Sequence, residues 1–117
     1  MPQMMKAAVV EEPKVIKVKE VPVPEIGYGE VLINVKACGI CGTDLHIYNG
    51  KYCRDRLPLI PGHEFSGVVS KVGENVPGLE IGDHVTADIN MSCGSCFYCK
   101  EILDKIKFIH PLYQCLY

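Results

Sequence analysis

The stretch PGHEFSGVVSKVGENV (residues 61–76) places a histidine and a glutamate directly before an apolar run that contains glycines at positions 67 and 73. A short apolar run among glycine turns is typical of a β-strand. His63 offers an imidazole and Glu64 a carboxylate, and both groups bind metal ions. As an isolated pair the two residues could form a loop salt bridge, but the glycine spacing around them argues against that interpretation.

Further strands are predicted on both sides of this stretch. The predicted strands cover residues 4–10, 14–21, 30–38, 65–73 and 83–89. Ile16 and Val18 alternate with lysines, as in a half-buried strand. In the next strand, one apolar set is expected to share a face: Val31, Ile33, Val35 and Ala37. Several short strands separated by Gly/Pro turns predict a mainly β sandwich or barrel.

One short helix is expected in this β-rich part, at residues 43–50 (TDLHIYNG). Thr43 or Asp44 is expected to cap it and Gly50 to stop it. Helical spacing returns only after Cys99, in KEILDKIKFIH (residues 100–110).

Length and composition limit the class of protein. The chain has 117 residues, of which 48% are hydrophobic, which suits one domain with a core. A formal net charge of -2 gives no reason to expect a nucleic-acid partner.

The first residues lack the apolar stretch of a signal peptide, and no segment has the length of a membrane span, so we expect a cytoplasmic protein without a membrane partner. Seven cysteines in a reducing compartment indicate metal binding more than disulfides.

A second stretch, CGICGTDLH (residues 38–46), supplies a complementary ligand. Cys41 offers a thiolate, and a thiolate with an imidazole and a carboxylate suits zinc. Ligands spread along the chain are typical of a catalytic zinc, which takes three protein ligands and leaves a position open. Cys38 is expected to be a small buried hydrophobic residue.

These two stretches together resemble the zinc-containing alcohol dehydrogenase family. The resemblance lies in GHEFSGVVSKVGENV and in CGICGTD, and GEVLINVKACGICGTDLHIYNG (residues 29–50) is most similar to the polyol and threonine dehydrogenase branch. It covers residues 5–99 and implies a GroES-like fold, a partly open β-barrel with short helices, for residues 1–99. It also implies a catalytic domain whose active site a Rossmann domain binding NAD or NADP would complete.

The resemblance implies roles for individual residues. Cys41 and His63 would be ligands of a catalytic zinc, and Glu64 would lie beside the metal or bind it. Asp44 would orient the zinc-bound histidine. Zinc would polarise a small alcohol or polyol, and hydride would pass to the nicotinamide ring.

Two further residues would carry the substrate proton in this family. Thr43 would accept it and His46 would relay it. Taken alone, Thr43 and Asp44 are more typical of helix caps, and His46 of a surface histidine on a short helix; within the CGICGTD motif the functional roles of Thr43 and Asp44 are favoured.

The last part of the chain departs from the family. Cys93, Cys96 and Cys99 resemble the opening of a structural-zinc lobe, but the fourth ligand would fall at Lys107. Residues 100–117 are interpreted as an atypical tail that arose by truncation or a frameshift; alternatively, Cys115 closes the site over a longer loop. No dinucleotide fingerprint occurs, so the chain is expected to be the front portion of a dehydrogenase, inactive in isolation.

Two other classes stay open. The chain could be a non-catalytic zinc-binding module on a GroES-like barrel. A zinc-free reductase relative is disfavoured by Cys41, His63 and the cysteine triplet. Whole members of the family are usually dimers or tetramers, so a homo-oligomer is left open too.

Overall fold

The computed structural model describes residues 1–87, and residues 88–117 lie outside this description. Strands dominate the described part, and all five predicted strands are confirmed. In chain order the elements are β1 (Met4–Glu12), β2 (Val15–Pro22), β3 (Val31–Gly39), α1 (Gly42–Tyr48), the 3-10 turn η1 (Arg54–Arg56), β4 (Glu64–Val72) and β5 (His84–Thr86).

The first sheet is the antiparallel hairpin of β1 and β2. Val9 and Val10 of β1 are buried. The expectation that Ile16 and Val18 are half-buried is wrong, because 50% and 73% of their surfaces are exposed. Alternation buries a strand face only where a second layer covers it, and these exposed fractions show that no described layer covers β2 there.

The second sheet has the order β3-β4-β5 and is antiparallel. Its buried core takes one valine from each strand: Val31, Val69 and Val85. The predicted common face of β3 extends from Val31 to the partly buried Ile33, but Val35 and Ala37 are exposed. The pairing register with β4 shifts between Leu32 and Ile33 and again between Val35 and Ala37, and irregularities of this kind redirect the side chains that follow them.

Helix α1 begins at Gly42, two or three residues earlier than a cap at Thr43 or Asp44 predicts. The expectation that Thr43 or Asp44 is the cap is wrong, because Cys41 occupies the N-cap position. Asp44 lies in the first turn, and its Oδ2 accepts a hydrogen bond from the backbone N–H of Cys41 over 3.0 Å. This contact satisfies an amide that the helix itself leaves without a partner. The predicted stop is confirmed, because the helix ends at Tyr48 and Gly50 follows at a φ of 71°.

Two backbone contacts join the segments around α1 to the first sheet. The N–H of Lys14, in the β1–β2 turn, donates to the carbonyl of Tyr48 over 2.6 Å. Val10 and Leu59 exchange backbone hydrogen bonds of 2.8 and 3.0 Å. The segment before β4 is therefore held against β1, and it leads directly to His63.

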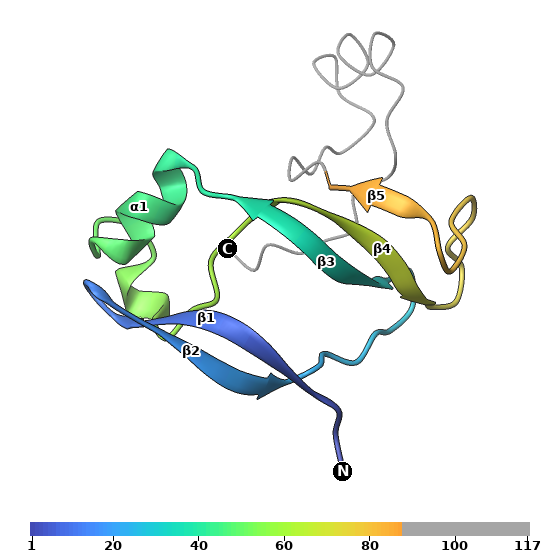
Figure 1. The fold of residues 1–117 in the computed structure, drawn as a ribbon, viewed down its shortest axis with the longest axis horizontal. Coiled ribbons are helices and arrows are strands. Elements are labelled where there is room, and N and C mark those ends of the chain that lie inside the picture. Colours follow the sequence, from blue (N-terminus) through green and yellow to red (C-terminus); the bar gives the residue numbers. More distant parts are fainter. Residues whose placement is uncertain (88–117) are drawn as a thin grey trace, which may run out of the picture.

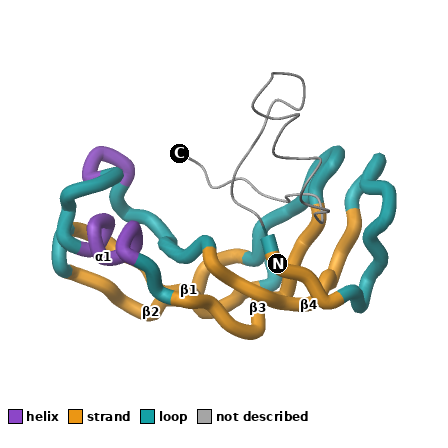
Figure 2. The backbone as a smooth tube through the Cα atoms, turned by 90° about the horizontal axis from the view of Figure 1, so that it is seen from above, coloured by secondary structure: helices purple, strands orange, loops and turns teal. Residues whose placement is uncertain are grey.

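The two sheets lie next to each other without closing into a complete barrel, in agreement with the expected mainly β, partly open barrel. Figure 1 shows α1 at one end of the molecule, beside the β1–β2 hairpin, and β5 at the opposite end. In Figure 2 the helical segments again gather at the hairpin end. Among the described residues, no helix is long and apolar enough to cross a membrane.

Candidate metal centre

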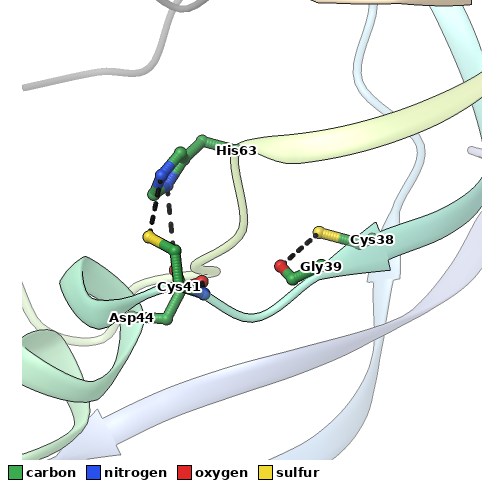
Figure 3. Close-up of polar contacts among 5 residues, drawn as sticks. All are labelled: Cys38, Gly39, Cys41, Asp44 and His63. Carbon is green, nitrogen blue, oxygen red and sulfur yellow. Dashed lines mark hydrogen bonds and ion pairs between the residues drawn. The ribbon is translucent and has the colours of Figure 1, made fainter.

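Cys41 and His63 meet although 22 residues separate them in sequence. The Sγ atom of Cys41 lies 3.1 Å from Nε2 of His63 (Figure 3). Cys41 precedes α1 and His63 precedes β4, so each side chain extends from the start of a regular element. His63 is a buried polar residue, with 8% of its surface exposed. Burying a polar group such as an imidazole costs free energy unless a hydrogen bond or a metal ion compensates for the lost water.

Asp44 completes a group of three donors. Its Oδ1 lies 3.8 Å from Nδ1 of His63, the ring nitrogen that does not face Cys41. Oδ1 is buried and has no hydrogen-bond partner among the described residues. A carboxylate beside the second nitrogen of a metal-binding histidine fixes the orientation and tautomer of the ring.

The donor set fits zinc. One ligand atom from each of Cys41, Asp44 and His63 lies within 4.8 Å of the others. Zinc bonds of about 2.3 Å to sulfur and about 2.0 Å to nitrogen, at a tetrahedral angle, would separate the two atoms by about 3.5 Å. The observed separation of 3.1 Å is close to that value, so a small movement would admit the ion. The buried, unpartnered carboxylate oxygen agrees with a site built for a cation.

Thr43 and His46 share a surface cleft. They lie three residues apart on α1, a spacing that places two side chains on one helix face. The cleft has a volume of about 450 Å³ and is also lined by Lys51 and Tyr52. Sequence reasoning missed Lys51 and Tyr52, because no motif marks them and only their nearness to His46 could have pointed to them.

Glu64 lies outside the group that Cys41 and His63 form. It is the first residue of β4, is exposed, and pairs with Gly39 of β3. Its predicted contact with the metal therefore stays a prediction. The predicted structural-zinc cysteines, Cys93, Cys96 and Cys99, and the alternative ligand Cys115 lie outside the described residues.

One prediction about cysteine burial is wrong. Cys38 was expected to be buried, but it is exposed near the end of β3, where the alternating pattern of the strand has already been interrupted by the bulge. Its Sγ donates to the carbonyl of Gly39 over 3.5 Å and not to the Cys41–His63 pair. Of the two cysteines of CGIC, Cys41 belongs to the group with Asp44 and His63, and Cys38 does not.

Comparison with known proteins gives a family match over most of the chain. The model of the alcohol dehydrogenase GroES-like domain matches residues 27–110. An alcohol dehydrogenase of Geobacillus stearothermophilus is 52% identical over 98 residues, which cover 81% of this chain and 29% of that protein. An L-threonine 3-dehydrogenase of Bacillus subtilis is 53% identical over 83 residues, 68% of this chain and 24% of the relative. The chain thus spans less than a third of the length of these relatives.

Solved structures give the same result. The cobalt- and zinc-bound thermostable alcohol dehydrogenase of Pyrobaculum aerophilum is 37% identical, with a TM-score of 0.76 over 85% of this chain and 31% of that one. A zinc-binding dehydrogenase of Sinorhizobium meliloti bound to NADP is 40% identical, with a TM-score of 0.71 over 85% of this chain and 29% of that one. The predicted domain boundary at residue 99 stays a prediction.

Proposed function

This chain belongs to the alcohol dehydrogenase GroES-like domain family, and on that premise we propose that it supplies the zinc-binding, substrate-activating part of an alcohol or polyol dehydrogenase. One observation carries the proposal: the 3.1 Å approach of Cys41 Sγ to His63 Nε2, with the buried Oδ1 atom of Asp44 on the other side of the ring. A thiolate and an imidazole from distant parts of a chain are typical ligands of a catalytic zinc.

The metal-holding role falls to Cys41 and His63. Zinc bound by these two side chains would supply a Lewis acid that polarises an alcohol oxygen and lowers its pKa. The Asp44 carboxylate faces Nδ1 of His63 from 3.8 Å, and a carboxylate on this side of the ring favours the orientation in which Nε2 is directed at Cys41. Its Oδ2 simultaneously holds the backbone of Cys41, so one carboxylate orients both proposed ligands.

Proton transfer falls to the residues of the α1 cleft. The Thr43 hydroxyl accepts the proton of the substrate hydroxyl, and His46 receives it from Thr43 and passes it to water. The shared cleft supports this route, because it gives both side chains access to the same small molecule and to solvent.

The proposed hydride acceptor is NAD or NADP, and the proposed substrate is a small alcohol, polyol or amino alcohol. The NADP-bound Sinorhizobium meliloti structure supports the cofactor class. The likeness to the Bacillus subtilis L-threonine 3-dehydrogenase and to a Bacillus subtilis sorbitol dehydrogenase, 45% identical over 104 residues (86% of this chain, 29% of that protein), supports the substrate class.

Cobalt titration tests the metal site directly. The experiment uses a chain carrying Cys93→Ser, Cys96→Ser and Cys99→Ser, hereafter the triple-serine chain, so that the second predicted metal set cannot contribute. We expect one Co²⁺ per chain, with a thiolate-to-cobalt charge-transfer band that Cys41→Ser removes. Cys53, the residue before η1, lies outside the group of Cys41, Asp44 and His63, so the control Cys53→Ser should leave the band intact. A triple-serine chain that folds and binds no cobalt would contradict the proposal.

A further inference from the structure

The sulfur of Cys38 lies beside Gly62, the residue that precedes His63. Gly62 has a φ of 110°, a conformation that residues with a Cβ rarely adopt, and a Cβ placed on it would lie 2.9 Å from the Cys38 Sγ. The side of Gly62 on which a side chain would stand is therefore already taken by the Cys38 sulfur. Gly62 precedes His63, so this contact lies one residue away from a proposed metal ligand.

The β-ladder does not reach His63. Pairing between β3 and β4 ends at Gly39 and Glu64, with Cys38 paired to Phe65 one step before the end. On the other side, the last described backbone bridge before His63 is the one between Val10 and Leu59. Residues 60–63 thus cross from β1 to β4 without belonging to either sheet ladder, and a side-chain contact in this interval has a direct effect on where His63 lies.

An apolar cavity lies beside this contact. It has a volume of about 410 Å³ and is lined by Cys38, Pro61 and Gly62, by mostly apolar residues of β1, β2 and α1, and by Asp44. Without the sulfur, the segment that carries His63 would lose its contact on one side and would have free volume next to it. The structure around a removed side chain relaxes in part into the space that is left.

We infer that Cys38 is a positioning residue for the metal centre. Its sulfur limits where Gly62 can lie, and this in turn sets the distance between the His63 ring and the Cys41 sulfur. The inference rests on the proposed function, because it concerns the same site. Cys38 is not a ligand in this arrangement, since the group of metal-binding atoms comprises Cys41, Asp44 and His63. Figure 3 shows the Cys38 sulfur directed at the carbonyl of Gly39, apart from the Cys41–His63 contact.

Zinc and cobalt binding by the triple-serine chain tests the inference without any enzyme assay. Cys38→Ala is expected to weaken zinc binding about 10- to 100-fold, the loss typical of groups that orient a metal ligand. Cys38→Ser keeps an atom at the γ position and is expected to retain most of the affinity. In both variants the thiolate-to-cobalt band persists, because Cys41 supplies the thiolate.

A double-mutant cycle measures the contact itself. Gly62→Ala alone is expected to weaken zinc binding because its Cβ collides with the Cys38 sulfur and because its φ is unfavourable. The loss is expected to be smaller in a Cys38→Ala background, where the collision is absent.

Each outcome decides between interpretations. Equal zinc affinity of the Cys38→Ala and unsubstituted chains, or strictly additive losses in the cycle, would overturn the positioning role. Loss of the charge-transfer band in Cys38→Ser would make Cys38 a ligand and overturn it as well. If Cys38→Ala does not fold by circular dichroism, Cys38→Ser is compared with Cys38→Val, whose branched side chain overfills the contact with Gly62, and equal affinities overturn the inference. Absence of metal from the unsubstituted triple-serine chain refutes the proposed function, and this inference with it.

Discussion

The backbone N–H of Cys41 donates a 3.0 Å hydrogen bond to Oδ2 of Asp44, while Oδ1 of the same carboxylate faces His63 from 3.8 Å. One side chain thus contacts the backbone at the start of α1 and also faces the imidazole of His63, the residue that precedes β4. Because 22 residues separate Cys41 from His63, this shared carboxylate connects two segments whose relative position decides whether a metal can bind.

Asp44→Asn separates the two tasks of the carboxylate. An amide oxygen can still accept the hydrogen bond from Cys41, so the helix start should persist, but the negative charge beside His63 is lost. We expect zinc affinity of the triple-serine chain to fall about 10- to 100-fold. Asp44→Ala also removes the acceptor of the Cys41 N–H, so it should lower the free energy of unfolding of the metal-free chain by about 1 kcal/mol, an effect that Asp44→Asn should not have. Zinc competition with a chromophoric chelator and urea unfolding measure the two effects, and unchanged zinc affinity in Asp44→Asn would exclude the orienting role.

The distribution of metal between two sets of cysteines separates the dehydrogenase proposal from a non-catalytic zinc module. In the complete chain we expect Cys41→Ser and Cys93→Ser each to lower the zinc content measured by mass spectrometry of the native protein, because they belong to different predicted sites. A zinc content that falls to zero in Cys93→Ser but is unchanged in Cys41→Ser would favour the non-catalytic module. Cys53→Ser serves as the matched control.

Thr43 is expected to affect turnover and not metal binding. The test is a chimera in which residues 1–87 of this chain replace the matching part of the Geobacillus stearothermophilus alcohol dehydrogenase, to which the chain is 52% identical over 98 residues. Thr43→Val should lower kcat by about 10²- to 10⁴-fold, the contribution typical of a positioned proton acceptor, while zinc content stays constant. Thr43→Ser keeps the hydroxyl and should restore most of the rate. A Thr43→Val chimera that turns over like its parent would remove Thr43 from the proton route.

The second sheet supports the site through a small core. Val69 is 1% exposed at the centre of this sheet, and Val69→Ala should reduce the free energy of unfolding by about 2 kcal/mol. Val35→Ala is the matched control, because Val35 lies on the neighbouring strand and is 49% exposed, so its loss should stay within about 0.5 kcal/mol. Chemical unfolding of the metal-free chain measures both, and equal losses would contradict the assigned faces of β3 and β4.

The strands and the donor types of the site could be predicted from the sequence because both depend on local information. Apolar alternation and glycine or proline turns act on neighbouring residues, and all five strands were found at the expected places. Cys41, His63 and Glu64 were predicted as candidate ligands because their residue types suit zinc, and Asp44 entered through the resemblance of CGICGTD to the family motif. The stop of α1 at Gly50 likewise depends on the backbone of one residue.

Burial and contact, in contrast, were decided by tertiary structure. Ile16, Val18 and Cys38 were expected to be covered and are exposed, because a face is buried only where a distant segment packs on it. The sequence alone indicated which groups could bind zinc, but only the fold brought Cys41 to 3.1 Å from His63 and set the Cys38 sulfur against Gly62. The physical reason is that local preferences choose the elements, whereas the bridge at Leu59, the bulges of β3 and the shared carboxylate of Asp44 fix where those elements meet.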